Sequence, residues 1–365
     1  MTSYIDIINF DWQSVEIGIW HNGFDIVRAT VESEHQQMTV ESSEAVSSCR
    51  LQIEDLEADC EYRLTVNYPA GEERLKFRTL PAPVGEQLAA YAVISDPHIS
   101  SKHDNRKGRL FVESAQILQT VFQHCNELKL DFALIGGDLT NNAEQAEFEK
   151  LTDCLQLVEF PLICAPGDHD LKPDACLWNS YLQDYNNVNF STELFNIKAI
   201  NTSTSSLTAT DARRLESMLD DPRIPVIVTH VHLLHNPNLK YGPKAAGITN
   251  YAEYKTLFER LEQRQSIIYA GHQNIPTQVQ HGQLTQFNVP QTCQFPCSWY
   301  YVRAFANGLY HKNIPIPSEI LRQQSRLDSE RAADYFAEPH WRSEYRCGSS
   351  PAAGNFLLPL KLKDK

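Results

Sequence analysis

The feature that most constrains the fold of this chain is a series of short polar clusters, each placed directly after an apolar stretch. From Tyr91 to Asn274, apolar stretches of strand length alternate with amphipathic helical patterns. This alternation predicts an α/β layer architecture. The clusters are Asp96-Pro97-His98, Gly136-Gly137-Asp138, Gly167-Asp168-His169-Asp170, His230 with His232, and Gly271-His272-Gln273-Asn274.

The position and the residue types of these clusters both indicate a metal site. In open α/β sheets, the loops beyond the carboxyl ends of the strands converge on the ligand crevice. Asp, His and Asn side chains are ligands of divalent transition metals. A single Gly-Asp pair more often forms a turn or a helix cap, and a solitary histidine more often packs near a core strand. Independent turns have no reason to place acids and imidazoles after successive strands, so the whole series predicts a metal centre.

The order of the clusters resembles the calcineurin-like metallophosphoesterase superfamily, whose pattern runs Asp-x-His, Gly-Asp, Gly-Asn-His-Asp/Glu, His and Gly-His-x-His. The resemblance implies a four-layer fold, with two central mixed sheets flanked by helices. It implies that Asp138 bridges two metals, and that His169, oriented by Asp170, contacts the phosphate or protonates the leaving group. The residues implied as metal ligands are Asp96, His98, Asp138, Asp168, His230, His272 and Asn274.

Two positions depart from the pattern of that superfamily. Asp168 stands where the family has an asparagine, and Asn274 stands where it has the last histidine. An ionised carboxylate has no hydrogen-bond donor to offer a phosphate. Both changes introduce oxygen donors, which favour Mn²⁺ or Mg²⁺ over Zn²⁺. We expect two divalent cations, Mn²⁺ or Fe²⁺ in the first place, with Mg²⁺ or Zn²⁺ as alternatives.

The resemblance implies a binuclear metal-dependent phosphoesterase that uses a metal-bridging hydroxide. Its expected substrate is a small phosphorylated molecule, either a phosphodiester, with cyclic nucleotides included, or a phosphomonoester. The alternative is a catalytically degenerate protein that binds metal or nucleotide and acts through partner contacts. The nearly complete ligand set and His169 favour the enzyme. A basic cluster at Lys102, Arg106, Lys107 and Arg109 either guides phosphate to the metals or is only the charged start of a helix.

The first part of the chain has a different pattern, with short alternating runs from Tyr4 to Thr79 and a turn expected at His21-Asn22-Gly23. This predicts an antiparallel β-sandwich. The segment Leu51–Val66 resembles the second half of a fibronectin type III domain, with Tyr62 at the tyrosine corner of that immunoglobulin-like (Ig-like) fold. The predicted domains are a fibronectin III-like sandwich and linker at 1–84, the metallophosphoesterase domain at 85–316, and a helical extension with a mostly flexible tail at 317–365.

Composition narrows the expected partners and location. The net charge of −14 opposes binding to nucleic acid and to anionic membrane surfaces. No stretch approaches the roughly 18 apolar residues of a membrane span. The nine cysteines are an odd number and are scattered, which favours free thiols in a reducing compartment, and hence a cytoplasmic protein. A protein partner or a second copy could bind through the N-terminal domain or the tail, where Leu357, Leu358, Leu360 and Leu362 could also dock on their own chain.

Overall fold

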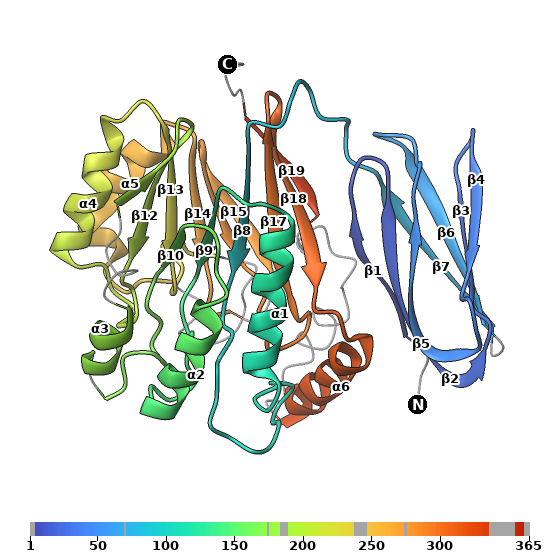
Figure 1. The fold of residues 1–365 in the computed structure, drawn as a ribbon. Coiled ribbons are helices and arrows are strands. Elements are labelled where there is room, and N and C mark those ends of the chain that lie inside the picture. Colours follow the sequence, from blue (N-terminus) through green and yellow to red (C-terminus); the bar gives the residue numbers. More distant parts are fainter. Residues whose placement is uncertain are drawn as a thin grey trace.

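The computed structural model describes residues 4–68, 71–173, 175–182, 189–236, 247–273, 276–335 and 355–360. Within these ranges the chain forms an all-β region first and a larger region of two sheets and several helices after it (Figure 1). The mixed α/β arrangement predicted for the larger region and the all-β arrangement predicted for the first region are both confirmed.

The N-terminal region is a sandwich of a three-stranded and a four-stranded antiparallel sheet, in the orders β1-β2-β5 and β4-β3-β6-β7. Its core is apolar, because alternate residues such as Val15, Ile17 and Ile19 point between the sheets. The strands are β1 (Tyr4–Phe10), β2 (Val15–Asp25), β3 (Arg28–Glu32), β4 (Gln37–Glu41), β5 (Val46–Ile53), β6 (Glu61–Tyr68) and β7 (Gly71–Arg78).

Two local features of this sandwich bear on the sequence predictions. The turn predicted at His21-Asn22-Gly23 is wrong, because β2 continues through these residues with an irregular register against β5. Tyr62 is buried, and its hydroxyl accepts a hydrogen bond from the backbone N–H of Glu57 at 2.9 Å and donates one to Gln36 Oε1 at 2.5 Å. The ring of Tyr62 is thus packed in the core while its hydroxyl is bonded to backbone a few residues upstream.

The larger region contains two six-stranded mixed sheets, in the orders β10-β9-β8-β17-β18-β19 and β11-β12-β13-β14-β16-β15. The strands are β8 (Ala89–Ile94), β9 (Phe132–Ile135), β10 (Leu162–Cys164), β11 (Asn189–Ser191), β12 (Phe195–Ile200), β13 (Ile224–Thr229), β14 (Ser266–Ala270), β15 (Thr277–His281), β16 (Leu284–Asn288), β17 (Ser298–Phe305), β18 (Gly308–Pro315) and β19 (Phe356–Pro359). The helices are α1 (Ser114–Glu127), α2 (Gln145–Leu155), α3 (Cys176–Leu182), α4 (Ala209–Leu219), η2 (Tyr251–Tyr254), α5 (Lys255–Glu262) and α6 (Glu319–Tyr335).

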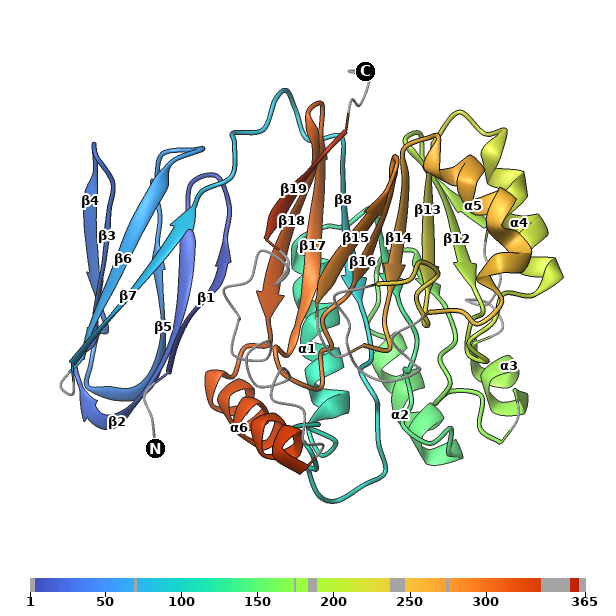
Figure 2. The ribbon, with the colours of Figure 1, turned by 180° about the vertical axis from the view of Figure 1, so that it is seen from behind.

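These elements stack in four layers. The two sheets face each other across an apolar core that includes Val93, Leu134 and Val228. Helices α1 and α2 cover the outer face of the first sheet, and α4 and α5 cover the outer face of the second (Figures 1 and 2). Central strands are therefore buried on both faces, which explains why they are continuous apolar runs in the sequence.

Strand direction decides where the polar clusters meet. Strands β8, β9 and β10 run parallel to one another, and so do β12, β13 and β14. Parallel strands end at the same edge of a sheet, so the residues after β8, β9, β10, β13 and β14 all lie at carboxyl ends. The fold thus brings together segments that are far apart in the sequence.

The last part of the chain is more ordered than predicted. Helix α6 packs between the first sheet and the N-terminal sandwich, and β19 pairs antiparallel with β18 (Figures 1 and 2). Within the tail predicted to be mostly flexible, Phe356–Pro359 forms a strand, because main-chain pairing with β18 fixes the segment. Leu357 and Leu358 dock on their own chain, and Leu362 lies outside the described residues.

The eight cysteines within the described part of the chain are free thiols. Among the helices that the structure describes, none combines the length and the apolar character needed to cross a membrane.

Candidate metal centre

Eight of the nine predicted site residues fall within the described ranges, and the structure gathers the side chains of seven of them at the carboxyl ends of the strands. The possible ligand atoms form three overlapping groups, and within each group all atoms lie within 4.8 Å of one another. The groups are His98, Asp138 and His169; Asp168, His230 and His272; and Asp96, Asp138 and His230.

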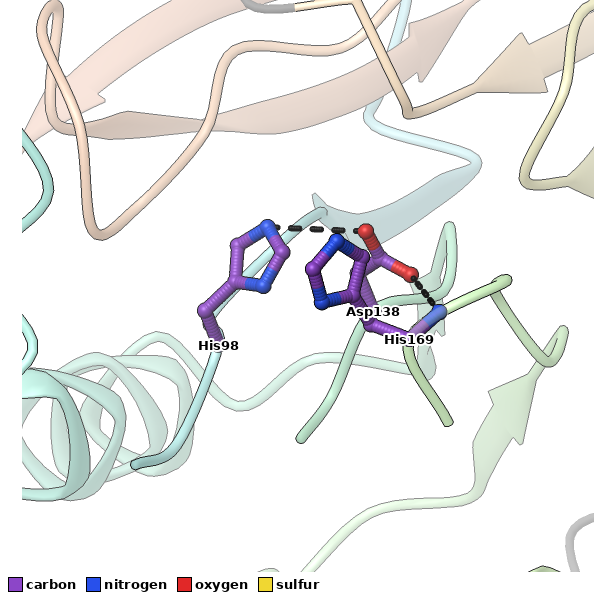
Figure 3. Close-up of side chains that lie close together, drawn as sticks. All are labelled: His98, Asp138 and His169. Atoms are coloured by element: carbon purple, nitrogen blue, oxygen red, sulfur yellow. Dashed lines mark hydrogen bonds and ion pairs between the residues drawn. The ribbon is translucent and has the colours of Figure 1, made fainter. Parts of the chain in front are cut away.

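The first group joins the ends of β8, β9 and β10. His98 Nε2 lies 3.5 Å from Asp138 Oδ2, and the backbone N–H of His169 donates to Asp138 Oδ1 at 3.0 Å. Figure 3 shows these three side chains and the two contacts. The imidazole rings of His98 and His169 lie edge to face, with centroids 4.8 Å apart. One carboxylate therefore faces two imidazoles from neighbouring strands.

The second group joins the end of β10 to the second sheet. Asp168 Oδ1 lies 3.2 Å from His230 Nε2 and 3.3 Å from His272 Nδ1. The two imidazoles also approach each other, with 3.1 Å between His272 Nδ1 and His230 Nε2. Three ligand atoms at such short separations define one compact position for a cation.

Asp138 and His230 connect the groups. His230 Nε2 lies 3.3 Å from Asp138 Oδ1, while Asp138 Oδ2 faces His98. The two oxygens of this carboxylate thus point toward different sets of ligands. His230 is held in place from its other side, since its Nδ1 lies 2.8 Å from the carbonyl oxygen of Gly136.

The backbone at the site is unusual. Asp96, His98, Asp138 and His272 all have positive φ values, of 49°, 44°, 53° and 67°. For residues with a Cβ this left-handed region costs on the order of 1–3 kcal/mol per residue, and such strain concentrates at functional sites. Four such residues in one cluster indicate that the backbone is strained where it directs these side chains inward.

Gly167 lets two strands approach closely. A Cβ at this position would lie 2.1 Å from Asp138 Oδ1 and 2.4 Å from the Asp138 backbone nitrogen. Any larger residue would therefore displace the carboxylate that links the groups. This close approach explains the glycine before Asp168 in the sequence.

Burial and mutual contact shift the pKa values of the acidic and imidazole side chains at the site. Burial raises the pKa of Asp96 and of Asp170 to about 7. Burial also acts against ionisation of Asp138, but the imidazoles, His230 first, hold its pKa well below the usual value. Despite burial, Asp138 and then Asp168 hold the pKa of His230 well above its usual value. Without cations, protons partly neutralise the excess of carboxylates, and a cation can displace them.

The donor set fits divalent cations. His98 is fully buried, yet within the described part of the chain neither of its ring nitrogens has a hydrogen-bond partner. Burial, and then the charge of Arg109, hold the pKa of His98 well below its usual value, so its imidazole is neutral. A buried neutral imidazole without hydrogen bonds, next to carboxylates, is in the state required of a metal ligand. Carboxylate oxygens and imidazole nitrogens together suit Mn²⁺, Fe²⁺ and Zn²⁺.

Two predicted site residues stand apart from this arrangement. Asp170 does not orient His169: its oxygens accept hydrogen bonds from Thr140 N at 2.7 Å and Gly167 N at 2.9 Å. Asp170 therefore fixes the loop that carries Asp168, and the imidazole of His169 is held instead through Nδ1 by the carbonyl oxygen of Asn141. Asn274 lies outside the described residues.

Sequence reasoning missed Gln291 beside Asp96, whereas Arg109, which also acts on Asp96, belongs to the predicted basic cluster. Gln291 Nε2 donates to Asp96 Oδ1 at 3.2 Å, and the charge of Arg109 lowers the pKa of Asp96. Gln291 follows β16, which runs parallel to β14, so the rule that found the other clusters applies to it as well.

Comparison with known proteins agrees with this geometry. The sequence pattern of the calcineurin-like phosphoesterases matches residues 90–297. A probable glycerophosphodiester phosphodiesterase of Arcobacter nitrofigilis is 30% identical over 82 residues, which are 21% of this chain. The match spans only 28% of the length of that relative.

Among solved structures, a dimetal phosphatase from Danio rerio is similar with a TM-score of 0.50 and 10% identity, over 63% of this chain and 97% of that one. This likeness shows a shared fold. A purple acid phosphatase from yellow lupin, Lupinus luteus, has a TM-score of 0.41 and 10% identity, over 85% of this chain and 72% of that one.

Proposed function

This chain belongs to the calcineurin-like phosphoesterase family, and we propose that it hydrolyses a phosphodiester with the help of two divalent cations. The family consists of metal-dependent hydrolases of phosphoric esters that act on small phosphorylated substrates. The observation that carries the proposal is the position of Asp138, whose two oxygens face two different sets of ligands. A carboxylate between two ligand sets suits a pair of metals that act together.

The proposed ligands divide into two sets around Asp138. Asp96 and His98 would hold one cation, with Asn274 as a further proposed ligand. Asp168, His230 and His272 would hold the other, and we propose Mn²⁺ or Fe²⁺ for both. When bound, two such cations supply the positive charge that polarises a phosphoryl group and activates water at neutral pH.

His169 is the proposed proton donor to the leaving group. Its Nδ1 faces the carbonyl oxygen of Asn141, which can only accept a hydrogen bond. Nδ1 therefore carries a hydrogen, and Nε2 is the atom that gains or loses a proton as the leaving oxygen departs. The side chain of His169 is half-buried beside His98, so it can reach a substrate while the carbonyl fixes its tautomer.

The name of the Arcobacter relative supports a phosphodiester as the substrate class, with cyclic nucleotides included and phosphomonoesters as the second choice. The positive charge of Arg109 beside Asp96 is suited to an anionic substrate. The second candidate function is a metal-binding protein without turnover. It is favoured by Asp168, whose charge repels a phosphate that an asparagine would bind.

We also propose that the N-terminal sandwich is fibronectin III-like, which the hydrogen bond between Tyr62 and Glu57 supports. The chain would then divide near residue 84, in the segment after β7, and again near residue 316, before α6. Any contact of the sandwich with a partner would use surfaces other than the side of β1 that packs against β18.

The proposal is tested by hydrolysis of a generic aryl phosphodiester. Chelator-stripped protein would be assayed with and without added Mn²⁺, beside an Asp138→Ala variant. We expect turnover that depends on Mn²⁺ and is lost in the variant. Folded protein that takes up Mn²⁺ but hydrolyses neither an aryl diester nor an aryl monoester would support the binding protein instead, and Asp168→Asn would then be the first reversion to assay.

A further inference from the structure

Helix α6 lies between the N-terminal sandwich and α1 (Figures 1 and 2), and it contacts the loops that follow β8 and β16. Its first turns carry Glu319 and Arg322, which are buried against the sandwich, and its middle carries Ser325 and Ser329, which are buried against the loops. A single helix therefore contacts both regions of the molecule through polar side chains that solvent does not reach.

On the sandwich side, the contacts are charged and directional. Arg322 forms two parallel hydrogen bonds with Asp6 of β1, at 2.7 and 2.9 Å, and two more with Glu319, both at 2.9 Å. Arg50 of β5 binds the same Glu319 at 2.9 Å. Paired forks of this kind fix the orientation of a side chain as well as its position. The sandwich thus holds the start of α6 through two of its strands.

On the site side, α6 binds the backbone of two segments. The hydroxyl of Ser325 donates to the carbonyl oxygen of Gly108 and accepts from the backbone N–H of Phe295 at 2.7 Å. Gly108 has a φ of +81°, and a Cβ there would lie 1.9 Å from Ser329 Oγ. Gln294 ties the segments together, since its amide donates to the carbonyl oxygen of Lys107 at 2.8 Å.

Residues 291–295 border Asp96, and the segment at Gly108 is hydrogen-bonded to them. The backbone N–H of Leu110 donates to the carbonyl oxygen of Cys293 at 2.7 Å, and the backbone N–H of Thr292 donates to the carbonyl oxygen of Ser95 at 3.2 Å. Gln291 completes the series with its hydrogen bond to Asp96 Oδ1. The path from the sandwich to this carboxylate consists of hydrogen bonds, one turn of α6 and the short main-chain segment from Phe295 to Gln291.

We propose that Arg322 is a positioning residue of the metal site, which acts through Ser325 on two linked backbone segments, one of which, residues 291–295, holds Asp96. The N-terminal sandwich is then part of the apparatus that shapes the site, and not a separate appendage. This inference rests on the proposed function for the identity of the site, but it concerns where Asp96 is held. Contiguous contacts alone do not prove coupling, so the test measures coupling directly.

The chain offers a matched control at the same interface. Lys312 of β18 binds Asp11 of the sandwich at 3.0 Å, so it also joins the two regions. No described contact leads from Lys312 to α6 or to the segments beside Asp96. Loss of this pair loosens the interface without disturbing the path through Ser325.

The experiment uses the full chain, stripped of metal, with Mn²⁺ alone as the probe. Mn²⁺ affinity would be measured by calorimetry for wild type, Arg322→Met, Ser325→Ala, the double variant and Lys312→Met, well below each melting temperature. We expect Arg322→Met and Ser325→Ala each to weaken Mn²⁺ binding at least about fivefold, with the double variant little worse than either, because residues on one path are not additive. We expect Lys312→Met to bind Mn²⁺ within about twofold of wild type.

Two results would overturn the inference. One is a folded Arg322→Met with wild-type Mn²⁺ affinity, or with a loss no larger than that of Lys312→Met. The other concerns the case in which Arg322→Met does not fold. The test then rests on Ser325→Ala, which removes only one hydroxyl, and wild-type Mn²⁺ affinity in this variant would overturn the inference.

The same measurements separate this inference from the proposed function. Wild type that binds Mn²⁺ but hydrolyses no aryl ester contradicts the function and leaves the affinity comparison valid. Wild type that binds and hydrolyses, with variants indistinguishable from it in both assays, contradicts only the role of Arg322. Wild type that fails to bind Mn²⁺ contradicts both.

Discussion

Two clusters of buried charge, one around Arg322 of α6 and one around Asp138, are balanced in opposite ways. Around Arg322, each carboxylate faces a guanidinium, and the forks of Arg322 are filled by Asp6 and Glu319. Around Asp138, the clustered side chains are carboxylates and imidazoles, and none of them carries a fixed positive charge. His98 has no hydrogen-bond partner within the described residues. The first cluster is complete with its own side chains, whereas the second becomes complete only with cations.

The comparison separates the energetic roles of buried charge. A guanidinium cannot release its proton. Loss of one partner in the Arg322 cluster therefore leaves a buried charge whose desolvation is not compensated. The site at Asp138 contains groups whose pKa values burial and neighbours have shifted, and these groups exchange protons instead. Stability should therefore depend on the first cluster and activity on the second.

The largest expected effect is on turnover. Asp138→Asn removes the charge between the two ligand sets while keeping an oxygen to accept from the His169 backbone. We expect the rate of aryl phosphodiester hydrolysis with Mn²⁺ to fall by about a thousandfold or more, on the scale of losing a primary electrostatic group. The free energy of unfolding without metal should change by about 1 kcal/mol or less, because His230 can release its proton to compensate. A variant that loses stability and keeps its turnover would reverse the comparison.

The second effect is on stability. Arg322→Met leaves the carboxylates of Asp6 and Glu319 buried without their main partner. We expect the free energy of unfolding to fall by about 3–5 kcal/mol, as for other broken buried ion pairs. Urea titration followed by circular dichroism would measure it, with Lys312→Met as a more exposed pair that should cost about 1 kcal/mol. Equal losses in the two variants would mean that burial of the pair does not matter.

The third effect is the pH dependence of metal binding. The pKa of Asp96 is raised to about 7, so this carboxyl is mostly protonated below pH 7 and must lose its proton to bind a cation. Mn²⁺ affinity should therefore rise with pH, by about a hundredfold from pH 5 to pH 8, and be lost as the pH falls. Calorimetry across this range would measure it. Asp96→Asn, which cannot titrate, should show a flatter dependence, and an unchanged slope would assign the proton to another group.

The smallest effect concerns a buried group without charge. Tyr62→Phe removes the hydroxyl that binds Glu57 N and Gln36 Oε1 in the sandwich. We expect a loss of about 1–2 kcal/mol in the free energy of unfolding and no change in Mn²⁺ affinity, because the path to the site does not include Tyr62. Urea titration and calorimetry of this variant would show whether neutral and charged buried groups of the sandwich differ as proposed.

The sequence predicts the centre of the molecule better than its edges. Strand β9, Phe132–Ile135, is one of the apolar stretches that the sequence predicts as strands, since a strand buried on both faces is mostly apolar. Strand β4, Gln37–Glu41, is not predicted, because its residues are half-exposed and mostly polar and only its pairing with β3 makes it a strand. Strand β19 is missed for a different reason: its residues are apolar, but its partner β18 lies in a distant part of the sequence.

The candidate site shows a similar limit. Asp96 and Asp138 are found from the sequence because acids after buried strands are conspicuous and parallel strands share an edge. The support of His169 by Asn141 is not found, because a backbone carbonyl leaves no trace in residue type. The burial of Arg322 is also not predictable from the sequence pattern, since an arginine in a polar helix is ordinarily exposed to solvent.

The order of the strands in the first sheet has a consequence for how the protein is made. Strand β8, which carries Asp96 at its end, has β9 on one side and β17 on the other, with Val93 opposite Tyr300. A growing chain can pair β8 with β9 early, but β17 leaves the ribosome only after the whole second sheet. Long-range pairing of this kind is slow to form. Nascent chains would therefore expose one edge of β8 through most of synthesis and would gain the backbone support for Asp96 among the last steps of folding.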